Sequence, residues 1–334
     1  MPDARAANLL TVKDLTVDFR TSNGWLTVVD GVSFDIRPGE IVGLVGESGS
    51  GKSVTSLALM RLLPPRASRI ARGSVMLGDV DLTTLPERRL ADLRGNEISM
   101  IFQEPMTSLN PAFTIGTQIT ETVRAHRSVS RAAALRRAIE VLELVGIPRP
   151  DRAVRSYPHE LSGGMRQRAM IAMAIACEPK LLIADEPTTA LDVTVQAQVL
   201  DVLRSMRAEL GMAILFITHD LGVVAELCDR VAVMYSGQIV ESAPVVDLFV
   251  SPNHPYSDGL LRSRPTLDGA GMTLRPRPGS PTAPGEITSG CRFAPRCVHA
   301  TELCVRDDID MRLTSDERAA RCVRIGEWQM EPVP

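Results

Sequence analysis

Residues 41–53 of the chain read IVGLVGESGSGKS, a short apolar run followed by a glycine-rich loop. The run Ile41–Val45 is typical of a strand buried on both faces, and residues 53–63 have helical character. The loop Gly46–Ser53 matches the pattern G-x-x-x-x-G-K-[ST] in the strand, loop, helix context that this pattern requires. Such a loop wraps phosphate groups with consecutive backbone N–H groups and with the amino end of the helix. The segment therefore predicts an α/β fold with a phosphate-binding site.

The residue types in this loop suit a nucleotide with a magnesium ion. Lys52 is expected to reach the β- and γ-phosphates, and the Ser53 hydroxyl is expected to ligate Mg²⁺. The expected nucleotide contacts come from Gly46, Ser48, Gly49, Ser50, Gly51, Lys52 and Ser53. The alternative interpretation is an ordinary glycine turn before a helix.

Two adjacent carboxylates follow a second apolar run. Residues 181–187 read LLIADEP, which places Asp185 and Glu186 at the carboxyl end of a buried strand, where ligands bind in open α/β sheets. Asp185 is expected to hold Mg²⁺, and Glu186 is expected to align and deprotonate a water molecule for attack on the γ-phosphate. A solvated acidic turn is the alternative.

The rest of the chain alternates between strand and helix patterns. The expected elements are an antiparallel sheet edge over Leu9–Ile36, helices over 130–145 and about 192–210, buried strands over 180–184 and 213–218, and a hairpin over 231–241. Strands that alternate with helices predict a parallel sheet with crossover helices. Between Arg264 and Gly290 the chain is rich in Pro and Gly, which is typical of an extended linker or of a segment that wraps around the domain.

Composition and charge exclude several classes of protein. The 334 residues carry 37 basic and 40 acidic side chains, so the net charge of -3 provides no overall positive field for binding nucleic acid. No apolar run approaches the roughly 20 residues that cross a bilayer. The amino terminus, MPDARAANLLTVKD, has charged residues before any apolar core develops, so no secretory signal is expected and the expected compartment is the cytoplasm.

Residues 161–168 read LSGGMRQR, which by spacing alone predicts only a helix over 166–177 capped by Ser162. This segment resembles the signature motif of ATP-binding-cassette (ABC) ATPases, and further motifs occur in that family's order. Phe19 resembles the aromatic residue that stacks on adenine, Gln103 in IFQEP the Q-loop glutamine, Asp192 in TTALD the D-loop, and His219 in ITHD the switch histidine. The resemblance covers about residues 9–250.

This resemblance implies an ATP-hydrolysing subunit whose nucleotide is held between two cassettes. ATP on the phosphate loop of one subunit would be clamped by Ser162, Gly163 and Gly164 of the other, which couples hydrolysis to domain closure. Gln103 would sense the γ-phosphate, contribute to the Mg²⁺ site and lie where a transmembrane partner docks. His219 would organise the attacking water together with Glu186.

The fold that the resemblance implies is the P-loop ABC ATPase fold, in the α/β class. It consists of a RecA-like core, an antiparallel β subdomain and a helical subdomain at about 104–164, together spanning residues 1–261. A small cysteine-containing extension would follow over 262–334.

Four of the six cysteines lie within 32 residues near the carboxyl end, with the spacing C-x5-C-x6-C-x17-C: Cys291, Cys297, Cys304 and Cys322. Four thiolates can hold Zn²⁺ or an iron–sulfur cluster, and this spacing matches neither zinc ribbons nor ferredoxins. His299 keeps a Cys3His zinc site open, and reduced cysteines that only pack the tail are a third interpretation. Cys177 and Cys228 are expected to be small buried hydrophobic residues.

The segments SPNHPY at 251–256 and GCRFAPRC at 290–297 resemble the carboxy-terminal extension of oligopeptide and dipeptide importer ATPases. The resemblance associates the four clustered cysteines with a [4Fe–4S] cluster. It also implies an ATPase subunit that powers peptide uptake from the cytoplasmic face of the membrane. The implied partners are two transmembrane permease subunits, a second ABC ATPase subunit and an extracytoplasmic peptide-binding protein, with no nucleic acid.

Two alternatives remain at this point. Related importers for nickel or oligosaccharides share these motifs. The other alternative is a soluble ABC ATPase that acts on DNA or ribosomes. Two features argue against it. Only about 110 residues separate Lys52 from Ser162, which leaves no room for a long coiled-coil arm, and the chain carries one set of motifs and not two.

Overall fold

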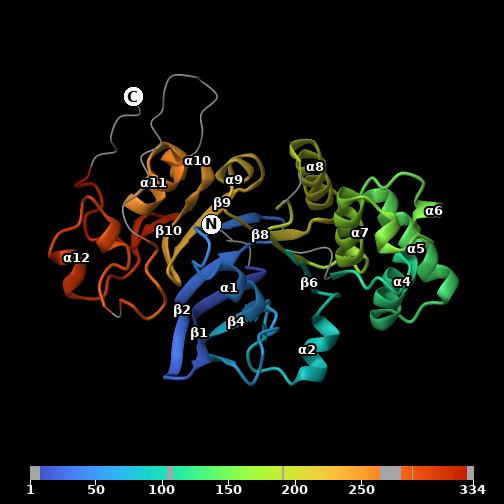
Figure 1. The fold of residues 1–334 in the computed structure, drawn as a ribbon, viewed down its shortest axis with the longest axis horizontal. Helices are drawn as coiled ribbons and strands as arrows, with labels where there is room; N and C mark the ends of the chain where they lie inside the picture. Colours follow the sequence, from blue (N-terminus) through green and yellow to red (C-terminus); the bar gives the residue numbers. More distant parts are fainter. Residues whose placement is uncertain (1–7, 104–107, 190–191, 264–279, 288, 329–334) are drawn as a thin grey trace, which may run out of the picture. The chain divides into compact units, whose positions relative to one another are not determined.

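The computed structural model describes residues 8–103, 108–189, 192–263, 280–287 and 289–328. The chain forms two compact units that interleave along the sequence. The first unit comprises Met1–Leu10, Asp35–Ile41 and Met76–Ile217, and the second comprises Thr11–Phe34, Val42–Val75 and Thr218–Pro334. Figure 1 shows the elements of both.

The first unit is built on three parallel strands. Strand β6 (Ile98–Ile101) pairs with β7 (Leu181–Asp185), which pairs with β8 (Ala213–Thr218), and every residue of the three strands is buried. Parallel strands that are buried on both faces read as continuous apolar runs, which is why the sequence predicts them well. Helix α8 (Val193–Leu210) connects β7 to β8, as expected for a crossover.

The helical part of the first unit consists of α4 (Ile115–His126), α5 (Arg131–Leu144), α6 (Pro150–Ala153), the 3-10 turn η1 (Pro158–Glu160) and α7 (Gly163–Ile175). Helices α4, α5 and α7 pack against one another (Figure 1). Ser130 caps α5 by accepting a hydrogen bond from the Ala133 N–H, so the predicted helix over 130–145 is confirmed. Residues 104–107 of the predicted helical subdomain lie outside the described residues.

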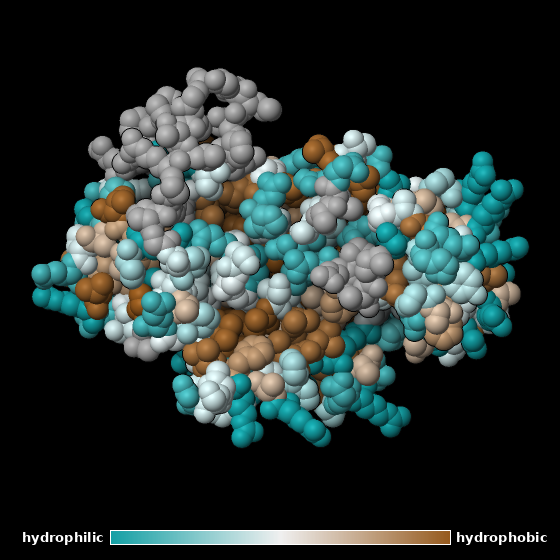
Figure 2. Space-filling model, viewed as in Figure 1, coloured by the Kyte–Doolittle hydropathy of each residue, from teal (hydrophilic) through white to brown (hydrophobic). Residues whose placement is uncertain are grey.

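The surface over α4 to α6 in Figure 2 is mostly hydrophilic, with apolar residues interspersed. Among the described residues, none of the helices combines the length and the apolar character that crossing a membrane requires. Two short elements, β5 (Val80–Asp81) and α2 (Glu87–Leu93), precede β6 in the chain, and β5 pairs with the end of β4.

The second unit begins with the predicted antiparallel edge. Strands β1 (Leu10–Thr21) and β2 (Gly24–Ile36) are neighbours, and β4 (Ser68–Leu77) lies on the other side of β1. Side-chain hydrogen bonds join residue 14 to 33, 16 to 31 and 18 to 27, which is the descending order of an antiparallel hairpin. The expectation for residues 9–36 is therefore confirmed.

A second sheet in this unit places the phosphate loop. Strand β3 (Ile41–Val45) pairs in parallel with β9 (Arg230–Tyr235), and β9 forms the predicted hairpin with β10 (Gln238–Pro244). Helix α1 (Lys52–Leu59) follows the loop and is shorter than predicted, because Arg61 adopts a left-handed backbone conformation with φ 49°. Helices α9 (Leu221–Leu227), α10 (Val245–Val250) and α11 (Pro255–Arg262) also belong to this unit.

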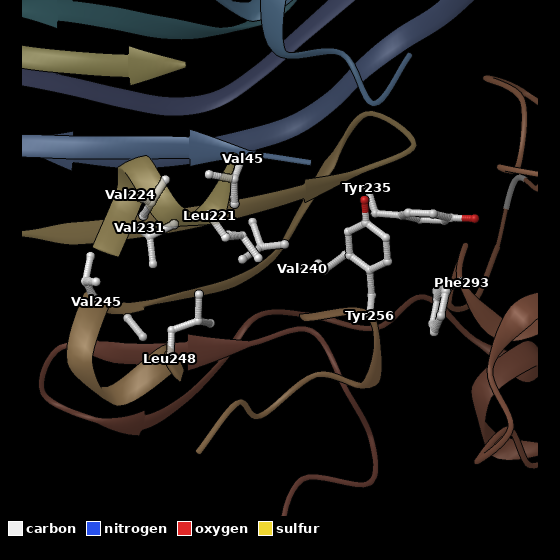
Figure 3. Packing of buried hydrophobic residues seen from close by; sticks show 12 residues of the cluster. Val45, Leu221, Val224, Val231, Tyr235, Val240, Val245, Leu248, Tyr256 and Phe293 are labelled. Atoms are coloured by element: carbon white, nitrogen blue, oxygen red, sulfur yellow. The ribbon is translucent and has the colours of Figure 1, made fainter. Parts of the chain in front are cut away.

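The carboxyl end of the chain adds to this sheet and to its core. Strand β12 (Arg318–Ala320) pairs antiparallel with β10 and with β11 (Arg312–Ser315). The turn η2 (Ala294–Arg296) and the short helix α12 (Leu303–Arg306) precede these strands. Phe293 packs in one buried cluster with Val45, Leu221, Tyr235 and Tyr256 (Figure 3). Most of the predicted linker over 264–290 lies outside the described residues.

Candidate nucleotide site and cysteine pocket

The phosphate loop lies between β3 and α1, as its sequence predicts. The Lys52 side chain is buried, and its ammonium group donates hydrogen bonds to the carbonyl oxygens of Gly46 at 2.8 Å and Glu47 at 3.0 Å. Gly51 is the N-cap of α1. Its φ of 105° is a backbone conformation that residues with a side chain rarely adopt. Ser53 is half-buried in the first turn of this helix. The backbone carbonyl oxygens of the loop thus hold the Lys52 ammonium beside the amino end of a helix, and such helix ends bind phosphate groups.

The two carboxylates lie at the end of β7 in the first unit. Asp185 is its last residue and is 4% exposed, whereas Glu186 is half-buried. The Glu186 carboxylate accepts hydrogen bonds from the Gln103 amide at 3.1 Å and from the Thr189 hydroxyl at 2.9 Å. Glu186 has φ 46°, and non-glycine residues in this region carry strain that is common at functional sites. The structure therefore brings Gln103 and Glu186 together.

His219 and Phe19 belong to the second unit. His219 follows β8 directly and is exposed. The next residue, Asp220, caps α9 by accepting a hydrogen bond from the Gly222 N–H at 2.7 Å. Phe19 is half-buried near the end of β1.

The signature segment and Asp192 line one surface cleft of the first unit, with a volume of about 570 Å³. Ser162 caps α7 by accepting a hydrogen bond from the Met165 N–H at 3.3 Å. The helix therefore begins at Gly163, and the predicted start at Arg166 is wrong, because the cap includes the two glycines in the first turn. A Cβ on Gly164 would lie 2.7 Å from the Val195 side chain, so a larger residue there would force a neighbouring group to shift. Helix α7 thus presents its amino end to the cleft.

The four clustered cysteines line a single small cavity of about 20 Å³ in the second unit. Its walls also include His254, His299 and Trp328. The chain closes around it from separate segments, since the Cys291 N–H donates to the carbonyl oxygen of Cys304 at 2.7 Å. Cys304 and Cys322 are buried, and Cys291 and Cys297 are half-buried.

Burial makes three of these thiols weaker acids than usual. It raises the pKa of Cys291 to about 12 and that of Cys322 to about 11, and it also raises the pKa of Cys297. Four thiols that line one enclosed cavity match the number of ligands that a zinc ion or an iron–sulfur cluster requires. In the arrangement of the described residues, however, no group of three or more His, Cys, Asp or Glu side chains could hold a metal ion.

Two residues of the segments 251–256 and 290–297, to which the sequence assigned no role at the nucleotide site, contact the phosphate loop. The Arg296 guanidinium forms an ion pair with Glu47, and the Tyr256 hydroxyl accepts a hydrogen bond from the Glu47 N–H. Both lie more than 200 positions away from Glu47 in the sequence. Because Glu47 occupies a position that the loop pattern leaves open, no sequence signal pointed to these contacts.

Comparison with known proteins agrees with this geometry. Residues 29–189 match the family model described as ABC transporter, and residues 240–304 match the one described as oligopeptide/dipeptide transporter, C-terminal region. The chain is 51% identical to a putative peptide import ATP-binding protein of Brucella melitensis, over 96% of this chain and 97% of that protein. The chain belongs to the ABC transporter ATPases. It is also 51% identical to the oligopeptide transport ATP-binding protein AppD of Bacillus subtilis, over 95% of this chain and 96% of that protein.

Solved ABC cassettes share the fold of this ABC ATPase. The chain matches a dimeric, post-hydrolysis structure of the ATP-binding cassette MJ0796 bound to ADP and Pi, with a TM-score of 0.64 and 26% identity. That match covers 71% of this chain and 98% of the cassette. The protein cbiO1 of Clostridium perfringens, described as part of the ABC transporter complex cbiONQ, matches with a TM-score of 0.62 and 25% identity, over 73% of this chain and 92% of that chain. The predicted α/β ABC ATPase fold is therefore confirmed.

Proposed function

We propose that the chain is the ATP-binding and ATP-hydrolysing subunit of an ABC importer that takes up dipeptides or oligopeptides across the cytoplasmic membrane. The observation that carries this proposal is the match of residues 240–304 to the C-terminal region of oligopeptide and dipeptide transporters. The names of the relatives at 51% identity support the same solute class. The domain division at residue 261 remains a prediction.

The proposed ATP site consists of the motif residues named above. In the second unit, Lys52 binds the β- and γ-phosphates, which suits a buried ammonium held between two loop carbonyls. The residues that would hold Mg²⁺ are Ser53, Asp185 and Gln103, and the ion neutralises phosphate charge when it is bound. Phe19 would stack on the adenine ring.

Glu186 is the proposed general base for the attacking water. The hydrogen bonds that its carboxylate accepts from Gln103 and Thr189 fix the orientation of that carboxylate. If Gln103 senses the γ-phosphate, it would therefore also orient the base. His219 is the proposed second residue that organises the attacking water.

The cleft beside α7 is the proposed clamp for the nucleotide of a second cassette. Ser162, Gly163 and Gly164 supply a hydroxyl and helix-end N–H groups, and anions bind at such ends. Asp192 lines the same cleft. The proposed partners are therefore a second ABC ATPase subunit, two permease subunits and an extracytoplasmic peptide-binding protein. The subunit would lie at the cytoplasmic face of the membrane.

This assignment is tested by affinity purification of the tagged full chain from membranes solubilised in mild detergent. We expect permease subunits and a second cassette to co-purify, and we expect a peptide-loaded binding protein to stimulate ATP hydrolysis. Stimulation by a nickel-loaded or an oligosaccharide-loaded binding protein would overturn the solute class. Co-purification with ribosomes or DNA in place of permeases would overturn the transport role.

The cysteine pocket is the proposed site of a [4Fe–4S] cluster, with Zn²⁺ as the alternative. The support is that Cys291, Cys297, Cys304 and Cys322 all line one enclosed cavity. Because thiolates are the ligands, metal binding would release protons from thiols whose pKa burial raises.

Metal analysis of anaerobically purified full chain tests this site. We expect brown protein with about four irons per chain and absorbance near 400 nm, since four thiolates ligate such a cluster. Replacement of Cys297 by Ser should remove most of the iron, whereas replacement of Cys177 by Ser should leave it, because Cys177 lies outside the pocket. Colourless protein with one zinc per chain would contradict the cluster.

A further inference from the structure

A buried arginine of the carboxy-terminal extension contacts the phosphate loop. Arg296, the last residue of η2, donates two hydrogen bonds to the Glu47 carboxylate, at 2.8 Å to Oε2 and 3.3 Å to Oε1. The Arg296 side chain is 7% exposed and that of Glu47 is 27% exposed. A guanidinium that contacts both carboxylate oxygens fixes their geometry as well as their charge.

A second contact holds the backbone of the same loop residue. The Glu47 N–H donates a hydrogen bond of 2.9 Å to the hydroxyl of Tyr256, a fully buried residue of α11. The carbonyl oxygen of Glu47 in turn accepts a hydrogen bond from the Lys52 ammonium. The side chain, the N–H and the carbonyl of Glu47 are thus all engaged, and the third of these contacts reaches the lysine that would bind phosphate.

The arginine is held in place by packed aromatic rings. The Tyr235 ring lies 4.6 Å from that of Tyr256 and 5.3 Å from that of Phe293, between ring centroids (Figure 3). The Arg296 guanidinium carbon lies 5.8 Å from the Tyr235 ring and 5.9 Å from the Phe293 ring. Arg296 also donates to the Tyr235 hydroxyl at 3.4 Å. These contacts pack the guanidinium in the orientation in which it meets Glu47.

We propose that Arg296 is a positioning residue of the nucleotide site: through its ion pair with Glu47, the extension holds the phosphate loop in the shape that binds the triphosphate. The inference rests on the proposed function, since it requires this loop to hold ATP. It deepens that function because it gives the extension a role in the ATPase cycle of its own chain. The loop pattern by itself does not require an acidic residue at position 47.

The pair is tested by a double-mutant cycle on the full chain, with the dissociation constant for Mg-ATP as the readout. Arg296→Met keeps the apolar stem and removes the charge, and Glu47→Gln keeps the shape and removes the charge. We expect each variant to weaken ATP binding about tenfold, and we expect the double variant to be no weaker than either single one, because both remove the same interaction. Arg296→Lys should restore part of the affinity.

The matched control is Arg306→Met, because Arg306 is another extension arginine whose ion pair, with Glu302 at 3.7 Å, is solvent-exposed. It should bind ATP like the wild type. Dissociation constants are measured well below the unfolding temperature of each variant. A merely structural role would lower the unfolding temperature and leave the dissociation constant unchanged. If Arg296→Met does not fold, the dissociation constant of the isosteric variant Glu47→Gln for Mg-ATP decides whether the ion pair supports ATP binding.

Two outcomes would overturn the inference: folded single variants that bind ATP as tightly as the wild type, or losses that multiply in the double variant. Lys52→Ala separates this failure from that of the proposed function. If Lys52→Ala binds ATP much more weakly than the wild type and Arg296→Met binds it as tightly as the wild type, only the positioning role fails. If the wild type itself does not bind ATP, the proposed function fails.

Discussion

Glu186→Gln is expected to bind ATP nearly as tightly as the wild type and to accumulate as a stable nucleotide-bound pair of cassettes. The substitution removes the proposed base but keeps the shape of the side chain, and its amide oxygen can still accept the hydrogen bonds from Gln103 and Thr189. Hydrolysis would otherwise release the pair, so its loss should trap the closed form. The measurement is the chromatographic shift and the retained nucleotide after incubation with Mg-ATP, using the full chain purified with its partner cassette.

Glu209→Gln is the matched control, because Glu209 is exposed at the end of α8, away from the Gln103 contact. It should elute and turn over like the wild type. Release of nucleotide by Glu186→Gln at the wild-type rate would remove Glu186 from the role of base.

Lys52→Ala is expected to weaken Mg-ATP binding about 100-fold, which corresponds to roughly 2.8 kcal/mol. The reason is that Lys52 supplies the ammonium group that the loop holds between the carbonyl oxygens of Gly46 and Glu47. A charge-assisted hydrogen bond from such a group to phosphate is about twice as strong as a neutral one. Titration of the full chain with a fluorescent ATP analogue, followed by displacement with ATP, measures the change.

Lys180→Ala serves as the comparison variant, since the Lys180 side chain is 66% exposed and pairs with Glu97 at the surface. It should keep the wild-type affinity. Equal affinity of Lys52→Ala and the wild type would show that the nucleotide binds elsewhere.

Local patterns predicted the elements well where burial was complete. The run 213–218 is apolar throughout because β8 is buried on both faces, and the structure has the strand at those residues. Helix α8 was equally clear, since Asp192 caps its start and Gly211, with φ 62°, ends it. The sequence does not predict helix ends that lack such a signal. Nothing in it indicates that Arg61 leaves the helical conformation after α1.

The contacts within the sites join residues that are distant in the sequence, so the sequence alone does not predict them. The motifs identified Glu186 and Gln103 separately, but only the fold shows that their side chains meet at 3.1 Å. The cysteine spacing left the geometry of the tail open, whereas the structure encloses all four thiols in one cavity. Arg296 and Glu47 each lie in a recognised segment, but no motif indicates that they pair, because 249 positions of sequence separate them.

The central claim is that this chain hydrolyses ATP at the phosphate loop with Glu186 as the base. Its most direct test is the rate of phosphate release from Mg-ATP by the full chain assembled with its permeases and partner cassette, measured side by side for the wild type and Glu186→Gln. We expect steady release by the wild type and a loss of about 10² to 10⁴-fold in the variant, the range that general base catalysis supplies. Equal rates in the two assemblies, or no release by the wild type, would contradict it.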